Sequence, residues 1–195
     1  MRSALFLSRR HLLATGLAAM AAPVLAAAPE GWTLPEEHLP RMVRLRDSFE
    51  PGQILVDPNS FALYWTLPKS EAIRYTVGVG RGNLYEPGTF RVGAKKEWPS
   101  WTPTKEMIAR NPGNYARYAD GMPGGPGNPL GARAIYLFDD ARGDTFLRIH
   151  GTPEPWTIAS AVSNGCVRLV NEHVAQLFDL VPLGSRVVLY AKAAA

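Results

Sequence analysis

The hydrophobic pattern of this chain becomes regular after Gln53, where short segments rich in β-branched and aromatic residues follow one another. Each segment is bounded by Gly, Pro, Asn or Asp, a pattern typical of short strands joined by turns. The run from Phe61 to Trp65 is apolar throughout, which predicts a strand buried on both faces. The turn-forming Asp57-Pro58-Asn59-Ser60 before it predicts a hairpin. The predicted strands are Gln53–Val56, Phe61–Leu67, Ile73–Val79, Gly88–Ala94, Ala134–Phe138, Thr145–Ile149 and Arg186–Tyr190.

Two helices are predicted among these strands. A short one covers Thr104–Arg110. The other covers Asn171–Val181, with Asn171 as its N-cap and with Pro182 and Gly184 ending it. Its apolar residues recur at i, i+3, i+4 and i+7, which gives the helix one apolar face. These residues are Val174, Leu177, Phe178 and Val181.

Two segments lack a strand or helix period. Residues 29–51 are rich in Pro and Glu, and we interpret them as a lead-in that packs against the domain. Residues 121–131 are rich in Gly and Pro. A flexible linker between domains is the alternative for this second segment. Strand patterns continue on both sides of it, which favours a long ordered loop near the functional site.

Residues 1–28 have the three parts of a secretory signal. Arginines form a basic start, Leu12–Leu25 is apolar and rich in Ala, and small residues up to Ala28 offer a cleavage site. An uncleaved membrane anchor is the alternative. The apolar stretch is short for a membrane span, so no stable span is expected after cleavage. Ser8–Leu13 also fits a twin-arginine export signal, which leaves two export routes open.

Length, charge and cysteine content limit the function classes. The chain has 195 residues and a formal net charge of +4 at pH 7. Loss of Arg2, Arg9 and Arg10 with the signal lowers that charge to +1, so nucleic acid is not expected as a partner. The remaining chain has the size of one domain. Cys166 is the only cysteine and cannot form an internal disulfide. Because exported proteins usually pair their cysteines, this unpaired thiol is a candidate reactive group.

Two polar segments carry the candidate chemistry. His150 ends a predicted strand, and Cys166 lies in a Gly-containing turn shortly before a helix. A neighbouring imidazole raises the thiolate fraction of a cysteine, and the backbone N–H groups of Gly165 and Cys166 are candidates for binding an oxyanion. A small buried core residue is the alternative role for a lone cysteine. The polar, turn-like sequence around Cys166 favours a nucleophile, with His150 as its base.

Other kinds of site are disfavoured. His11 lies in the signal, His38 in the lead-in, and His173 in the first turn of the last helix, where a solvated or locally hydrogen-bonded role is expected. No HExxH, no CxxC and no histidine pair at ligand spacing is present, so no metal site is expected. A cysteine-based phosphatase needs Arg six positions after its Cys, where this chain has Glu172.

The segments His150-Gly151-Thr152-Pro153 and Ser163-Asn164-Gly165-Cys166-Val167-Arg168 together resemble the signature of the L,D-transpeptidase catalytic (YkuD) domain family. The resemblance extends over about residues 52–191 and is not confined to this signature. The further segments similar to the family are Glu86–Phe90, Trp98–Pro103, Glu106–Ile108, Asn128–Gly131 and the pattern from Asn171 to Gly184.

The resemblance implies a mainly β, L,D-transpeptidase-like β-sandwich or barrel domain with a few short helices, acting on peptidoglycan stem peptides in the periplasm. Such enzymes form a cysteine thioester with the third residue of a donor tetrapeptide stem and release D-Ala. The acyl group then passes to an amine of a second stem, giving a 3→3 cross-link, or to a lipoprotein lysine. Carbapenems acylate the cysteine, and neither a metal nor an organic cofactor is used.

Transferred to this chain, the resemblance implies that Cys166 is the nucleophile, that His150 is the general base, and that the carbonyl of Gly151 orients the imidazole. Arg168 is suited either to a substrate carboxylate or to a structural salt bridge. Many family members have His where this chain has Asn164, which leaves the role of a second histidine open. The residues expected to support the site or to bind the substrate or the oxyanion are Ser163, Asn164, Gly165 and Arg168.

Several alternatives stay open at the level of sequence. Water as the acceptor gives an L,D-carboxypeptidase, and amide exchange is another outcome of the same thioester. A non-catalytic cell-wall binding module with this fold predicts no covalent carbapenem adduct. A sortase-like transpeptidase is disfavoured, because the chain has no Thr-Leu-x-Thr-Cys run. For Trp98, Trp101 and Tyr136, core packing and the lining of a substrate groove are the two alternatives.

Overall fold

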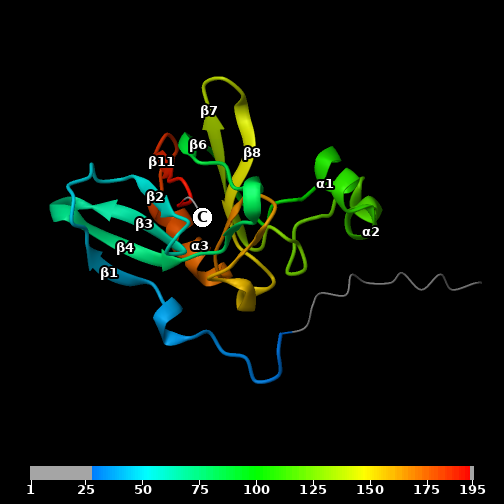
Figure 1. Ribbon diagram of the computed structural model, residues 1–195, viewed down its shortest axis with the longest axis horizontal. Helices are drawn as coiled ribbons and strands as arrows, with labels where there is room; N and C mark the ends of the chain where they lie inside the picture. Colours follow the sequence, from blue (N-terminus) through cyan, green and yellow to red (C-terminus); the bar gives the residue numbers. More distant parts are fainter. Residues whose placement is uncertain (1–27, 194–195) are drawn as a thin grey trace, which may run out of the picture.

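The computed structural model describes residues 28–193, and the fold is mainly β with a few short helices, as predicted (Figure 1). One sheet has nine strands in the order β1-β4-β3-β2-β11-β6-β7-β8-β10, and a small sheet pairs β5 with β9. The strands are β1 (Arg41–Arg44), β2 (Ile54–Asp57), β3 (Ala62–Leu67), β4 (Glu71–Thr76), β5 (Val79–Gly80), β6 (Gly88–Glu97), β7 (Arg133–Asp139), β8 (Gly143–His150), β9 (Ala161–Ser163), β10 (Val167–Arg168) and β11 (Arg186–Leu189).

The helices are short and lie outside the sheet. The α-helices are α1 (Lys105–Arg110), α2 (Pro112–Tyr115) and α3 (Asn171–Leu180). The 3-10 helices are η1 (Glu36–His38), η2 (Pro68–Ser70), η3 (Gly82–Leu84), η4 (Ala116–Tyr118) and η5 (Pro155–Thr157). In Figure 1, α1 and α2 lie to one side of the sheet, and the β7–β8 hairpin extends beyond the other strands. Among the described residues, no helix is both long and apolar enough to cross a membrane.

Every predicted strand has a counterpart in the sheet, but one of them is divided. The segment predicted as 73–79 forms β4 and β5, because Val77 and Gly78 carry the chain from the large sheet to the small one. The turn after Asp57 joins β2 and β3 as an antiparallel hairpin, and Asp57 Oδ1 accepts a hydrogen bond from the Asn59 N–H at 3.0 Å. Three strands were not predicted, namely β1, β9 and β10.

Gly78 brings the chain after β4 against β10, one of the two edge strands of the large sheet. This residue follows β4 and exchanges two backbone hydrogen bonds of 2.8 Å with Arg168 of the edge strand β10. The sheet therefore curls toward a closed barrel, as expected for a β-sandwich or barrel. The closure fixes the position of the turn that carries Cys166, because this turn lies between β9 and β10.

The hydrophobic core lies inside the curled sheet and beneath α3. Tyr75, Leu63 and Ile135 are fully buried there. Helix α3 packs on β7 and β8, with Val174 and Leu177 buried. The apolar face predicted for this helix is thereby confirmed. The run from Phe61 to Trp65 is mostly buried, as predicted, although Phe61 and Tyr64 keep partial exposure.

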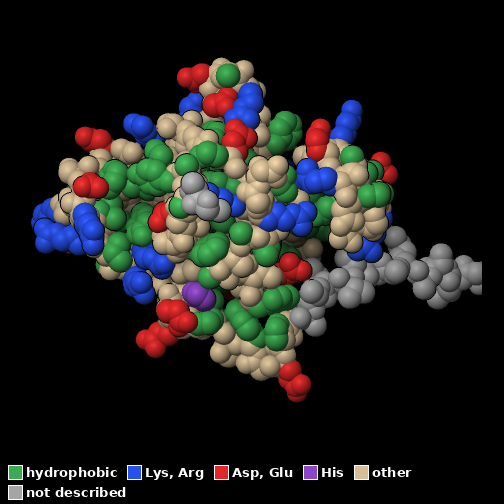
Figure 2. Space-filling model, in the orientation of Figure 1, with side chains coloured by type: hydrophobic (Ala, Val, Ile, Leu, Met, Phe, Trp, Pro, Cys, Tyr) green, Lys and Arg blue, Asp and Glu red, His purple; other side chains and the backbone are tan. Residues whose placement is uncertain are grey.

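The lead-in contributes a strand to the edge of the sheet. Strand β1 pairs antiparallel with β4, with Met42 opposite Ile73. Upstream of it, the Trp32 ring packs edge-on against Trp156, with 6.3 Å between ring centroids. The expected export signal, residues 1–28, lies outside the described residues except for Ala28. On the face shown in Figure 2, acidic and basic side chains are interspersed among apolar and neutral ones.

Candidate active site

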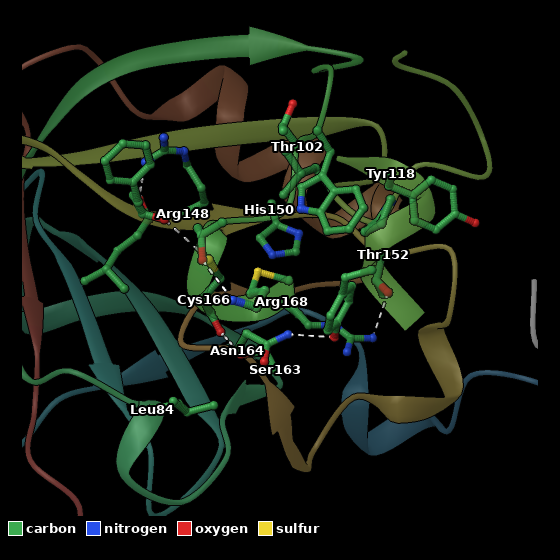
Figure 3. Close-up of a pocket in the computed structure, with 18 of the residues that line it drawn as sticks. Leu84, Thr102, Tyr118, Arg148, His150, Thr152, Ser163, Asn164, Cys166 and Arg168 are labelled. Carbon is green, nitrogen blue, oxygen red and sulfur yellow. Dashed lines mark hydrogen bonds between the residues drawn. The ribbon is translucent and has the colours of Figure 1, made fainter. Parts of the chain in front are cut away.

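Cys166 and His150 line one cavity of about 830 Å³. His150 is the last residue of β8, and Cys166 precedes β10, which pairs in parallel with β8 so that Arg168 lies opposite His150. The two parallel strands thus place both residues at the same edge of the sheet. Figure 3 shows the Cys166 sulfur facing the His150 ring.

The carbonyl of Gly151 fixes the tautomer of the His150 ring. Nδ1 of His150 lies 2.6 Å from this oxygen. Because a carbonyl oxygen only accepts hydrogen bonds, Nδ1 carries the proton in the neutral ring. The lone pair of the neutral imidazole then lies on Nε2. A free Nε2 lone pair is the feature that a general base for a thiol requires.

Burial keeps both members of the pair neutral at rest. It lowers the pKa of His150 to about 3, and the positive charges of Arg168 and Arg148 act in the same direction. Burial also raises the pKa of Cys166, although Arg148 and Arg168 oppose that shift. Both shifts favour a thiol and a neutral imidazole at neutral pH.

A tight turn presents the thiol to the cavity. The Ser163 hydroxyl donates to the Cys166 carbonyl at 2.6 Å and accepts from the Gly165 N–H at 3.2 Å. Gly165 has a φ of 126°, and a Cβ there would lie 2.9 Å from the Leu84 carbonyl oxygen. Only glycine satisfies both conditions without strain. Ser163 and Gly165 thus build the turn.

The contacts of Arg168 are those of a structural guanidinium. Its Nη2 atom donates to the hydroxyls of Thr152 at 2.8 Å and Thr157 at 2.6 Å, and it lies 3.7 Å from Glu154. These partners belong to the chain between β8 and β9. Of the two roles that the sequence leaves open, the contacts favour the structural salt bridge.

Asn164 points away from His150 and toward a segment that covers the cavity. This cover segment, residues 101–122, leaves the body between Trp101 and Met122, whose backbones exchange hydrogen bonds of 2.9 and 2.6 Å. Asn164 Nδ2 donates to the Tyr115 hydroxyl at 2.9 Å. Asn164 therefore ties the turn that carries Cys166 to the cover segment instead of contacting the imidazole.

The aromatic candidates divide between two environments. Trp101 and Tyr136 line the cavity, and Trp101 packs edge-on against the rings of Tyr115 and Tyr118. Trp98 is 45% exposed and belongs to neither the core nor the cavity wall. The Gly- and Pro-rich loop 121–131 also reaches the cavity, through Met122, Gly127, Pro129 and Leu130.

Sequence reasoning missed two features of the cavity wall. Arg148 forms a bidentate ion pair with Asp144, at 2.7 and 2.8 Å, and lies over the Tyr136 ring. Phe146 is 70% exposed at a φ of 61°, and its carbonyl oxygen lies 3.9 Å from the Cys166 sulfur. The segment 145–149 was predicted only as a strand, because nothing in its pattern marks a positive φ.

Asn171 has a role that differs from the predicted one. The N-cap of α3 is Val170, and Asn171 is the first residue of the helix. Its Oδ1 atom accepts from the backbone N–H groups of Ala132 at 3.0 Å and Thr152 at 3.1 Å. The N-cap prediction was therefore wrong, because the side chain satisfies two distant backbone groups instead of its own helix end. Within residues 28–193, no group of three or more His, Cys, Asp or Glu side chains is placed to hold a metal ion.

Comparison with known proteins points to one family. A model of the L,D-transpeptidase catalytic domain (YkuD) matches residues 51–189. An L,D-transpeptidase homologue of Fuscovulum blasticum, from the ATP synthase subunits region, is 36% identical over 93% of this chain and 96% of its own length. The L,D-transpeptidase homologues ErfK/SrfK and YbiS of Escherichia coli are 33% and 32% identical over 76% and 82% of this chain. This chain spans about half of their lengths, 47% and 50%.

Solved structures share the fold. A Brucella melitensis protein, named as a carnitine operon oxidoreductase, is 44% identical over 83% of this chain and 96% of its own, with a TM-score of 0.55. That name applies to the Brucella protein alone. An Enterococcus faecium L,D-transpeptidase is 16% identical over 72% of this chain and 50% of its own, with a TM-score of 0.52. The predicted L,D-transpeptidase-like β domain is thereby confirmed.

Proposed function

This chain belongs to the L,D-transpeptidase catalytic domain family and is an enzyme of that class, and from this premise we propose that it forms a thioester at Cys166 with the third residue of a donor tetrapeptide stem in peptidoglycan. The observation that carries the proposal is the hydrogen-bond state of His150. Its Nδ1–H donates to Gly151, which leaves Nε2 to accept the proton of the facing thiol.

In acylation, His150 Nε2 accepts the thiol proton while the Cys166 sulfur attacks the carbonyl carbon of the third stem residue. The negative charge develops on the carbonyl oxygen. We assign the backbone N–H of Cys166 as its donor, because the N–H of Gly165 already donates to Ser163. The imidazolium then gives its proton to the D-Ala nitrogen, and the C–N bond breaks. D-Ala leaves, and the acyl group stays on the sulfur as a thioester.

In transfer, the neutral His150 accepts a proton from the acceptor amine while the amine nitrogen attacks the thioester carbonyl. The C–S bond breaks, and the departing sulfur takes the proton back from the imidazolium. An amine of a second stem gives a 3→3 cross-link, and a lipoprotein lysine gives protein attachment. Neither step requires a metal or an organic cofactor, since one base moves every proton.

The proposal extends to location and domain organisation. Residues 1–28 act as an export signal, residues 29–51 as a lead-in, and residues 52–191 as the catalytic domain of a periplasmic enzyme. Peptidoglycan lies outside the cytoplasmic membrane, so its stems are reached only after export. Fusing residues 1–28 to a reporter that is active only after export tests this point. Changing Arg9 and Arg10 to Lys then blocks export if the twin-arginine route is used, and leaves export intact if it is not.

Incubation with purified tetrapeptide muropeptides tests the proposed chemistry. Mass spectrometry should detect free D-Ala and cross-linked dimers, and Cys166→Ala should abolish both. His150→Gln should slow the reaction by about 100-fold or more, whereas the matched variant His38→Gln in the lead-in should leave it unchanged. Free D-Ala without dimers indicates a carboxypeptidase. If neither products nor a carbapenem adduct on Cys166 form, the protein is a binding module and the proposal is wrong.

A further inference from the structure

We propose that Arg81 and Arg110 form a carboxylate-binding subsite beside the nucleophile, which makes the enzyme select donor stems that carry a free carboxylate over amidated stems. The subsite consists of these two guanidinium groups and the side chain of Asn164. The inference deepens the proposed function and rests on it, since it concerns the stem peptide bound next to Cys166.

The two arginines converge on a single amide oxygen. Nη2 of Arg81 and Nη2 of Arg110 each donate to Asn164 Oδ1 at 3.3 Å. Arg81 follows β5 and Arg110 ends α1, so the groups come from distant parts of the chain. Asn164 lies two residues before Cys166, and both Asn164 and Arg110 line the cavity that contains Cys166. In Figure 3, Asn164 lies beside Cys166 in the cavity wall.

The charge at this point is unbalanced. Among residues 28–193, neither Arg81 nor Arg110 has an acidic partner within 4.0 Å. Besides Arg110, the arginines that line the cavity are both paired, Arg148 with Asp144 and Arg168 with Glu154. Glu106 lies one turn before Arg110 in α1, and the charge of Arg110 is a minor cause of its lowered pKa, but Glu106 is exposed and no ion pair within 4.0 Å joins the two. Two like charges therefore share one neutral acceptor, an arrangement that a negatively charged ligand stabilises.

A carboxylate fits this place better than the amide does. It offers two oxygens, one for each guanidinium, and a charge of the sign that the arginines lack. On binding, it takes the two donors from Asn164 Oδ1, while Asn164 Nδ2 keeps its hydrogen bond to the Tyr115 hydroxyl. A peptide acylated at Cys166 lies within reach of this point, because Asn164 belongs to the same turn as the nucleophile.

A tetrapeptide donor stem carries three carboxylates close to the scissile bond. One ends the departing D-Ala, one belongs to the acidic second residue, and one ends the side chain of a diaminopimelate third residue. The last two are converted to neutral amides in amidated stems, and the inference concerns these two. An amide lacks the negative charge and can present only one oxygen. As an acceptor for the two arginines, it is therefore no better than the side chain of Asn164. The subsite therefore predicts discrimination by amidation state, and donors amidated at one position at a time show which carboxylate it binds.

Equilibrium binding separates this inference from the proposed chemistry. In the Cys166→Ala background, titration calorimetry compares the tetrapeptide stem with stems amidated at the second or at the third residue. The unmodified stem should bind about fivefold tighter than one of the amidated stems, a modest factor because both arginines are exposed. Arg81→Gln or Arg110→Gln should reduce that ratio toward one. Arg81→Lys and Arg110→Lys should keep part of it.

Arg91→Gln serves as the matched control, because Arg91 is a half-exposed arginine on β6 that pairs with Asp140 at 3.8 Å. It should leave the ratio unchanged, and thermal melting checks that each variant is folded. Equal affinity for all stems overturns the inference, and so does a loss of affinity in the arginine variants that is the same for every stem. Turnover by the intact enzyme is measured separately, so transpeptidation without carboxylate preference refutes only the subsite.

Discussion

Replacing Asn171 by Ala should destabilise the domain and disturb His150 together. The substitution removes the acceptor of the Ala132 and Thr152 N–H groups, and Ala132 and Thr152 are 9% and 2% exposed. A buried donor left without a partner costs about 1–3 kcal/mol. Two such donors cost about 2–6 kcal/mol. The better helix propensity of Ala at the start of α3 returns about 0.5 kcal/mol, so we expect a net loss of about 1.5–5.5 kcal/mol.

Urea unfolding followed by circular dichroism measures this loss, and the melting temperature should fall by about 3–22 °C for a chain of this size. Gly151 lies between His150 and Thr152, and its carbonyl orients the imidazole. Carbapenem acylation of Cys166 should therefore slow by about tenfold or more under conditions where the variant is folded.

Asn171→Asp is the informative control, because it keeps an oxygen at the same position and should lose much less stability than Asn171→Ala. Asn111→Ala is a second control, since it removes only the side-chain acceptor at the start of α2, where Asn111 Oδ1 accepts from the Asn114 N–H at 3.2 Å. An unfolding free energy of Asn171→Ala within about 0.5 kcal/mol of the wild type, which is the range of ordinary surface changes, would show that the two N–H groups find other partners and that the reasoning is wrong.

Three further predictions follow from the geometry of the pair and its turn. The rate of alkylation of Cys166 by iodoacetamide should rise with pH and reach half its maximum above the ordinary thiol pKa of 9.0, because burial raises the pKa of Cys166. A constant high rate between about pH 5 and 7 would instead indicate a resting thiolate–imidazolium pair. The pKa of His150 is lowered to about 3, so the unfolded chain takes up a proton below pH 6.5 that the folded chain does not. Stability should therefore decline by about 1.4 kcal/mol per pH unit between pH 6.5 and 3, and chemical denaturation of His150→Gln should lack this share of the slope. Gly165→Ala should abolish acylation, because the added Cβ meets the Leu84 carbonyl oxygen at 2.9 Å, whereas Ser163→Thr should keep part of it. If intact-mass measurements show an unchanged acylation rate for Gly165→Ala, the turn does not require glycine.

The sequence predicts those parts of the fold that depend on local pattern. Strands β2, β3 and β7 carry continuous apolar or β-branched runs between turn residues, and their positions follow directly from those runs. Strand β10 has two residues and β1 lies in a polar segment, so neither has a period of its own. They form strands because β8 and β4 offer unpaired backbone groups beside them. Such strands are defined by a partner that is distant in the sequence.

The candidate site divides in the same way. Cys166 and His150 can be proposed from residue type and flanking sequence. The partners of Asn164 cannot, because Arg81 and Arg110 lie 83 and 54 residues away along the chain. Asn171 illustrates the same limit, since its residue type suits an N-cap and only the packing of α3 against residues 132 and 152 assigns it elsewhere.

The position of β11 links the two halves of the large sheet. This last strand lies between β2, its parallel partner, and β6, its antiparallel partner. Without it, β1-β4-β3-β2 and β6-β7-β8-β10 are two half sheets, each with an additional unpaired edge. Because β11 follows every other described strand along the chain, both half sheets precede the strand that joins them. The half sheet that carries Cys166 and His150 is thus joined to the β2 half only after β11 has formed.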